Sequence, residues 1–155
     1  MQMAMKRRGA FSLIELVVVV VILGLIATIA IPRVSRGAEG AAEASLRSDL
    51  SRLRSAISTY QAEHGGEFPE LANMPEALTQ YSASDGATSA TPDSTHIYGP
   101  YLSAIPTMKL GENKGLDTID GSEASGTAWV YDETTGEIYA NAAGTDDAGT
   151  DYKDY

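Results

Sequence analysis

The stretch that decides the fold begins as GAFSLIE at residues 9–15 and continues as LVVVVVILGLIATIAI at residues 16–31. Across residues 16–31 there is no charged side chain and only one hydroxyl. A helix rises about 1.5 Å per residue, so a helix here nearly crosses a hydrocarbon core of about 30 Å. The basic residues Lys6–Arg8 precede it and indicate a flank that stays in the cytoplasm. The sequence therefore predicts a membrane-spanning helix that begins near Phe11.

One acidic side chain, Glu15, lies at the start of this apolar stretch. An unpaired carboxylate in a hydrocarbon core is strongly unfavourable, so an acidic residue there usually has a charged partner and a function. Residues 16–31 provide no cation for it. Glu15 is therefore predicted to be a functional residue that meets a positive charge from elsewhere.

Several positions of this segment have a fixed spacing. A short basic leader ends in a small residue, and Phe11, Glu15, Gly24 and Pro32 follow. In this arrangement the segment resembles the type IV prepilin signature, which type IV pilins share with the pseudopilins of type II secretion. The resemblance implies that a membrane-embedded prepilin peptidase cuts before Phe11 and methylates its new amino group.

The position of the cut depends on the register of the signature. The family usually has glycine directly before the cut, whereas Ala10 stands between Gly9 and Phe11 here. Cleavage between Ala10 and Phe11 keeps Glu15 and the later positions in register, and it is the interpretation preferred. Cleavage between Gly9 and Ala10 is the alternative, and it shifts Glu15 by one position.

A cut before Phe11 also provides the missing positive charge. We expect the Phe11 amine of one copy to pair with Glu15 of an adjacent copy, because a buried carboxylate is tolerated when it meets a cation. This pairing makes Phe11 and Glu15 the predicted assembly residues. Two simpler readings are a secretory signal peptide cleaved near residues 28–30 and a plain signal-anchor helix. Neither gives Glu15 a role.

Composition limits the rest of the chain. The 155 residues suffice for one domain in addition to the N-terminal helix. There is no cysteine, so no disulfide is formed, and the resemblance makes this absence favour a pseudopilin. The formal net charge is -10 with the leader included. Such an acidic surface argues against nucleic acid or anionic lipid as a direct ligand of the globular part.

The helix is expected to continue from residue 32 to residue 63. Pro32 removes one backbone donor and is the predicted helix break. The resemblance implies that this stretch can melt when subunits pack into a filament. Further on, apolar residues at helical spacing predict one buried face, and its members are Leu46, Leu50, Leu53, Ile57 and Tyr60. His64-Gly65-Gly66 is the predicted stop.

Residues 64–155 are richer in turn-forming residues. Residues 75–81 predict a short helix with Pro75 in its first turn. Residues 128–131 and 137–140 flank a glycine-containing turn and predict a β-hairpin. Trp129 and Tyr139 are expected to face the core. Residues 109–126 are interpreted as a loop.

The final segment is acidic. Asp146, Asp147 and Asp151 are oxygen ligands of the kind that calcium prefers. Major pseudopilins, which the chain resembles, often hold a structural calcium ion in their C-terminal loops, so these three residues are the candidate metal ligands. The alternative is a solvated, mobile terminus.

No pattern of catalytic residues is found. The sequence has no cysteine nucleophile, Walker loop, GxSxG or HExxH motif. Its two histidines are His64, which is expected to cap a helix end, and His96, which is expected in a loop. An enzyme is therefore not predicted.

These observations predict an α+β, lollipop-shaped pilin-like fold in which a long N-terminal helix packs on a small antiparallel β-sheet. The expected parts are a cytoplasmic leader (1–10), a transmembrane and filament-core helix (11–31), its continuation (32–63) and a globular domain with a C-terminal hairpin and acidic tail (64–155). The domain is expected in the periplasm, anchored by a single pass through the inner membrane.

The resemblance implies a subunit of a homo-oligomeric helical filament, most like the major pseudopilin of type II protein secretion. Its implied partners are the prepilin peptidase, an inner-membrane assembly platform and minor pseudopilins. A type IV pilus subunit for adhesion, twitching or DNA uptake is the alternative. A membrane-anchored periplasmic binding module is the second alternative.

Overall fold

A computed structural model describes residues 11–155, with the side chains of residues 29–36 left undescribed. The chain divides into two compact units, the first ending at Glu39 and the second comprising Gly40–Tyr155. One helix, α1 (Leu13–Glu63), contributes to both units. The remaining elements are short and belong to the second unit. The predicted α+β class, with a long N-terminal helix and a small sheet, is confirmed.

In the first unit, α1 carries a nearly continuous apolar sequence. Its large apolar side chains, together with that of Phe11, are 48–81% exposed up to Ile26. Within the part of the chain whose side chains are described, no helix is long and apolar enough to cross a membrane. The span expected at residues 11–31 includes residues 29–31, whose side chains lie outside that part.

The backbone of α1 is helical before, at and after Pro32. The helix break expected at this residue is therefore not present. A proline removes one backbone hydrogen bond, and a long helix accommodates this loss when helical turns continue on both sides. The side chain of Pro32 lies outside the described residues. Melting of this stretch in a filament stays a prediction.

In the second unit, α1 buries the predicted stripe. Leu46, Leu50 and Leu53 are at most 1% exposed, and Ile57 and Tyr60 are at most 5% exposed. Their spacing of three and four residues puts them on one side of the helix. They form one core cluster with residues from the later elements, including Met74, Leu78, Met108, Trp129, Tyr131 and Ile138. The helical stripe is thus confirmed as the face on which the domain packs.

The predicted stop of this helix is also confirmed, because α1 ends at Glu63. The amide of Gly66 donates to the carbonyl of Gln61 over 2.9 Å. Gly65 and Gly66 have φ angles of 70° and 99°. The left-handed backbone region that reverses the chain after a helix favours glycine, so this dipeptide fixes where α1 ends.

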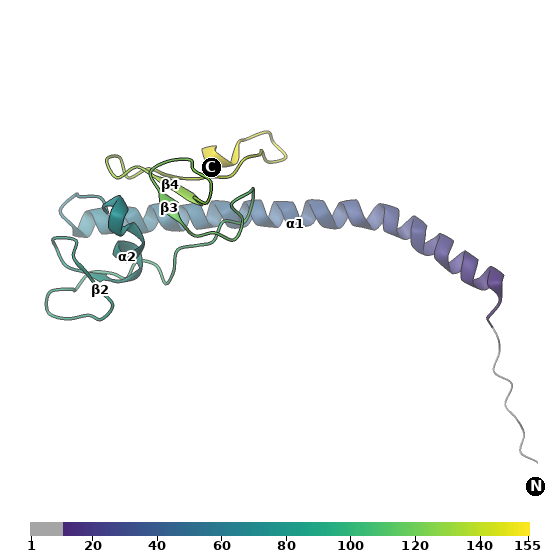
Figure 1. Cartoon of the computed structure of the whole chain (residues 1–155), viewed down its shortest axis with the longest axis horizontal. Coiled ribbons are helices and arrows are strands. Elements are labelled where there is room, and N and C mark those ends of the chain that lie inside the picture. Colours follow the sequence, from purple (N-terminus) through teal and green to yellow (C-terminus); the bar gives the residue numbers. More distant parts are fainter. Residues whose placement is uncertain (1–10) are drawn as a thin grey trace, which may run out of the picture. The chain divides into compact units, whose positions relative to one another are not determined.

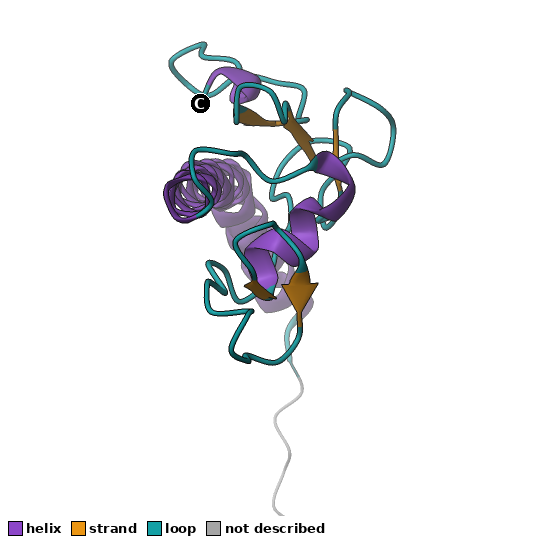
Figure 2. Cartoon of the chain, turned by 90° about the vertical axis from the view of Figure 1, so that its left-hand side faces the viewer, coloured by secondary structure: helices purple, strands orange, loops and turns teal. Residues whose placement is uncertain are grey.

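After α1 come η1 (Leu71–Asn73) and α2 (Met74–Thr79), with Pro75 at the start of α2 as expected. Two short strands follow, β1 (Tyr81–Ser82) and β2 (Thr88–Ser89), and they pair antiparallel. Figure 2 shows this small sheet and the second sheet at opposite ends of the η1–α2 segment.

The second sheet has the order β3-β4-β5 and lies beside the C-terminal part of α1 (Figure 1). Strands β4 (Trp129–Tyr131) and β5 (Ile138–Ala140) form the predicted antiparallel hairpin, with Val130 opposite Tyr139. Strand β3 (Ile119–Asp120) pairs parallel with β4, so the sheet is mixed. The interpretation of residues 109–126 as a loop missed β3.

The hairpin orients its aromatic residues by strand alternation. Trp129 is fully buried, as predicted, and its indole N–H donates to the carbonyl of Pro106 over 2.8 Å. Tyr139 was expected in the core and is only half-buried, because Ile138 and Ala140 on either side of it face inward. The core aromatic that accompanies Trp129 is Tyr131, which is 1% exposed.

The turn of the hairpin gives a stability test. A Cβ at Gly136 would lie 2.2 Å from Cε1 of Phe68, and its φ is 74°. A Cβ at Gly126 would meet nothing within 4 Å, although its φ is also positive, at 89°. Left-handed backbone costs an alanine about 1–2 kcal/mol, and overpacking adds about 1–3 kcal/mol. We expect Gly136→Ala to lower the free energy of unfolding by clearly more than Gly126→Ala.

Urea unfolding followed by the fluorescence of Trp129, the single tryptophan, measures both variants. Because both substitutions place alanine at a positive φ, their difference reports the contact with Phe68. Equal losses for Gly136→Ala and Gly126→Ala would contradict this assignment.

Candidate functional site

The N-terminal candidate site lies at the start of α1. The carbonyl of Ser12 accepts hydrogen bonds from the amides of Glu15, at 3.1 Å, and Leu16, at 3.2 Å. Serine is a favoured residue just before a helix, and an acidic residue in the first turn suits the positive end of the helix dipole. These local preferences place Glu15 in the first turn of α1.

The surface around Glu15 is apolar and open. Phe11 is 79% exposed, Leu13 81% and Ile14 69%. A contiguous exposed apolar surface of this kind is typical of a surface that contacts a membrane or other protein chains. The arrangement therefore places one carboxylate within a large exposed apolar surface.

Two of the predicted processing residues, Gly9 and Ala10, lie outside the described residues. The structure describes Phe11, the expected first residue after cleavage, as exposed and just before α1. The positions of the cut and of the methylated amine stay predictions.

The acidic tail is docked on the second unit. Asp146 forms an ion pair of 2.5 Å with Arg47 of α1, and its side chain is only 7% exposed. Arg54 donates to the carbonyls of Ile138 and Tyr155 over 3.1 and 2.5 Å. The guanidinium carbon of Arg47 lies 4.0 Å from the centroid of the Tyr155 ring. The tail thus differs from the mobile terminus considered as the alternative from the sequence.

Asp146 also organises the loop that contains it. Its Oδ1 accepts hydrogen bonds from the amides of Ala148 and Thr150, each at 2.9 Å. The hydrogen bond from the amide of Thr150 is the main cause that lowers the pKa of the Asp146 carboxyl below its ordinary 3.8, and the side chain of Tyr155, the amide of Ala148 and the charge of Arg47 lower it further. Asp146 is therefore held as a charged acceptor inside the folded tail.

The three predicted calcium ligands do not form a cluster. Among the residues with described side chains, no group of three or more histidine, cysteine or acidic side chains is arranged to hold a metal ion. Asp146 is bound to Arg47, and residues 145 and 151 are joined by an isolated antiparallel bridge. Calcium binding at Asp146, Asp147 and Asp151 stays a prediction. The observed positions of these side chains do not support it.

The two histidines have different surroundings. His96 contacts Asp93 at 2.9 Å, and the backbone amides of His96 and Thr95 are the main cause that lowers the pKa of Asp93 to about 2. His64 is 6% exposed, and its Nδ1 lies 2.8 Å from the carbonyl oxygen of Tyr60. This contact with a carbonyl of the last turn of α1 confirms the expected capping role.

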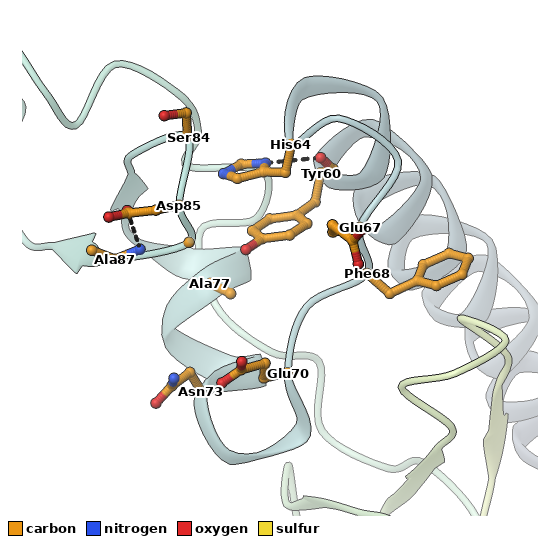
Figure 3. A pocket seen from close by; sticks show the side chains of 11 residues that line it. Tyr60, His64, Glu67, Phe68, Glu70, Asn73, Ala77, Ser84, Asp85 and Ala87 are labelled. Carbon is orange, nitrogen blue, oxygen red and sulfur yellow. Dashed lines mark hydrogen bonds between the residues drawn. The ribbon is translucent and has the colours of Figure 1, made fainter.

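A cavity that the sequence did not reveal opens beside this histidine (Figure 3). Its volume is about 480 Å³, and its lining comes from the end of α1, the connection that follows it, the η1–α2 segment and the turn between β1 and β2. The polar side chains that line it are Tyr60, His64, Glu67, Glu70, Asn73, Ser84 and Asp85. We call it the acidic cavity. The only local signal for it was the histidine at the helix end, because Asp85 comes from a different segment than Glu67 and Glu70.

Comparison with known proteins identifies the N-terminal segment. Residues 5–31 match the Prokaryotic N-terminal methylation motif, which is the signature of type IV pilins and pseudopilins. The resemblance inferred from the sequence is thus confirmed for this segment. The motif supports a pilin-like structural subunit that is processed by a prepilin peptidase. No curated protein and no solved structure matches the chain.

The ion pair of Asp146 predicts a pH dependence. A carboxyl whose pKa is lowered in the folded state contributes stability above its unfolded pKa and loses it as the pH falls through the folded pKa. We expect acidification below about pH 4 to remove the contribution of Asp146. Asp146→Asn should therefore lose less thermal stability than the parent chain between pH 6 and pH 3, in melting curves recorded by circular dichroism.

Asp117→Asn is the control, because Asp117 is exposed and forms no ion pair with another described residue. It should keep the acid sensitivity of the parent chain. An acid sensitivity of Asp146→Asn that equals the parent's would contradict the role of this carboxylate.

The calcium prediction has a separate test. If the three aspartates bind calcium, millimolar calcium chloride should raise the melting temperature and a chelator should reverse the shift, because a ligand that binds only the folded state stabilises it. Magnesium is the matched control, since it prefers a stricter geometry. A melting temperature that responds to neither calcium nor the chelator would refute the site.

Proposed function

We propose that this chain is a filament subunit that polymerises through α1 into a pseudopilus for type II protein secretion. The prepilin peptidase removes residues 1–10, residues 11–31 anchor the waiting subunit in the inner membrane, and the second unit faces the periplasm. The observation that carries the proposal is the exposed apolar half of α1, headed by Glu15, within the methylation motif.

The exposed side chains provide the driving force for assembly. Large apolar residues between Phe11 and Ile26 are at least 48% exposed on all sides of α1. Such a surface is covered either by lipid before assembly or by the same helix of other copies afterwards. The acidic second unit adds repulsion between copies, which leaves the N-terminal half of α1 as the adhesive part.

Glu15 provides the register. Cleavage before Phe11 creates an ammonium group four residues before Glu15, and methylation leaves its positive charge in place. Away from water, a carboxylate and an ammonium of neighbouring copies attract strongly only at short distance, and a carboxylate left alone is penalised. One position of each new subunit along the filament is thereby favoured over the others.

The choice of a pseudopilus over a surface pilus is supported by composition. The chain contains no cysteine, whereas many type IV pilins close their C-terminal region with a disulfide. We propose an inner-membrane assembly platform and minor pseudopilins as partners. The type IV pilus remains the alternative, and a filament seen at the cell surface at native expression would favour it.

A membrane-anchored binding module is the second candidate function, and the acidic cavity is the observation that favours it. The two functions differ in their need for Glu15. Binding in the second unit requires an anchor of any sequence, whereas assembly requires this carboxylate.

We expect Glu15→Ala to leave processing intact and to abolish filament growth, because the variant cannot pair with the Phe11 amine. The intact mass of the membrane-extracted protein tests processing, with a start at Phe11 and one added methyl group expected. Electron microscopy of sheared filaments tests assembly. Glu39→Ala is the matched control, since it removes an exposed carboxylate of α1 outside the motif.

Normal filaments from Glu15→Ala would contradict the register mechanism. A start at Ala10 would keep the family assignment and move the register by one residue. An uncleaved chain in cells with an active prepilin peptidase would contradict the filament function itself.

A further inference from the structure

The rim of the acidic cavity carries carboxylates that are not paired with any described cationic side chain. Glu67, Glu70 and Asp85 line it and are exposed. Among residues 11–155 with described side chains, no cation forms an ion pair with any of them. Asp85 uses Oδ1 to accept the amide of Ala87 at 3.1 Å. The rim therefore has carboxylate oxygens available to a positively charged group.

The charges of the rim act on the floor of the cavity. Tyr60 is 5% exposed, and burial raises the pKa of its hydroxyl, with further contributions from the charges of Glu70 and Asp85. These two carboxylates come from different segments, yet both lie close enough to affect the same hydroxyl. The cavity thus concentrates negative potential at one place.

His64 supplies a second, independent observation. Its ring stacks on Tyr60 with centroids 3.7 Å apart and planes at 4°. Nδ1 lies 2.8 Å from the carbonyl oxygen of Tyr60. A carbonyl only accepts hydrogen bonds, so Nδ1 carries a proton, and in the neutral imidazole Nε2 is then an acceptor. Nε2 is buried and has no partner among the described residues, which is an unfavourable state for a polar atom.

The ring that carries this acceptor lines the cavity. Figure 3 shows the imidazole of His64 beside the turn that carries Ser84 and Asp85. This turn is closed by hydrogen bonds of 2.9 Å between residues 83 and 86 and between residues 83 and 87. His64, Ser84 and Asp85 all line the cavity, so Nε2 of His64 is a buried acceptor in the wall of the cavity, without a partner in the part of the chain that the structure describes.

The chemistry of this lining selects the ligand. Carboxylates outside and an imidazole acceptor inside complement a cation that carries several N–H donors. No three of the described acidic or histidine residues are grouped closely enough to hold a metal ion. A guanidinium presents five N–H donors in a planar fork and reaches acceptors that are spread more widely.

We propose that the acidic cavity binds a guanidinium or primary ammonium group, which the rim carboxylates neutralise. One N–H of this group donates to Nε2 of His64. The proposal does not depend on filament assembly, because every residue involved belongs to the second unit.

A pair of probes that differ in one charge tests the proposal. Acetyl-arginine amide and acetyl-citrulline amide have nearly the same shape, and only the first is cationic. The full chain in detergent, labelled with ¹⁵N, is titrated with each probe. We expect saturable shifts at residues 84–87 and at Nε2 of His64 with the arginine probe only.

Two double variants distinguish binding in the cavity from a general attraction of the cationic probe to an acidic protein. Glu70→Gln combined with Asp85→Asn removes two charges from the rim and should weaken binding about fivefold. Glu112→Gln combined with Asp117→Asn removes the same charge from two exposed residues that do not line the cavity. This control should bind like the parent chain.

Three results would overturn the proposal. The first is an absence of saturable shifts with the arginine probe. The second is an equal response to acetyl-citrulline amide. The third is an equal loss of binding in both double variants, which would indicate only general electrostatic attraction. A response of the rim without any change at Nε2 would overturn the role of His64.

The cationic group has two possible sources, a free small molecule or the side chain of another copy. Arg52 is an exposed cation of α1 with no ion pair among the described residues. The cross-linking test combines Ser84→Cys at the cavity with Ser55→Cys, three residues after Arg52 on α1. Because the chain has no cysteine, these two are the only thiols present. A disulfide between copies in filaments assigns the source to a second copy. Binding of the probe without a cross-link assigns it to a free ligand.

Discussion

Everything in the second unit depends on one side of α1. Five apolar residues at helical spacing, from Leu46 to Tyr60, are the surface to which the rest of the domain attaches. The strands are two or three residues long and would not be stable alone. Their side chains, above all Trp129 and Tyr131, are buried in the same core cluster as this helix face. The sheet is thus better described as a cover for α1 than as an independent layer.

This dependence explains which parts of the fold were predictable. The helix stripe, the glycine stop and the β4–β5 hairpin have local patterns, and all three are present as predicted. Strand β3 has two residues, which is too short for alternation to be detected. Tyr139 was placed in the core because it is aromatic, whereas strand alternation turned it outward and Tyr131 took the core position.

The candidate sites also differ in how far the sequence could predict them. Phe11 and Glu15 can be recognised from the sequence, because the signature is defined by their spacing of four residues along the chain. The acidic cavity was not recognisable, since Tyr60, Glu70 and Asp85 meet only after α2 and the β1–β2 turn have packed. The tail is a different case. Its aspartates became candidate calcium ligands through their oxygen chemistry and the resemblance, and calcium binding stays a prediction. The ion pair of Asp146 was not predictable, because Arg47 lies 99 residues earlier.

The docked tail also sets the order of events during biosynthesis. Glu43, Arg47 and Arg54 contact residues that lie 109, 99 and 101 positions later in the chain. Contacts of such large sequence separation form slowly, because a long loop must close first. The leucine face of α1 therefore emerges well before its partners and needs protection from aggregation until they arrive. Completion of the domain is a late event that waits until residues 146–155 have been synthesised.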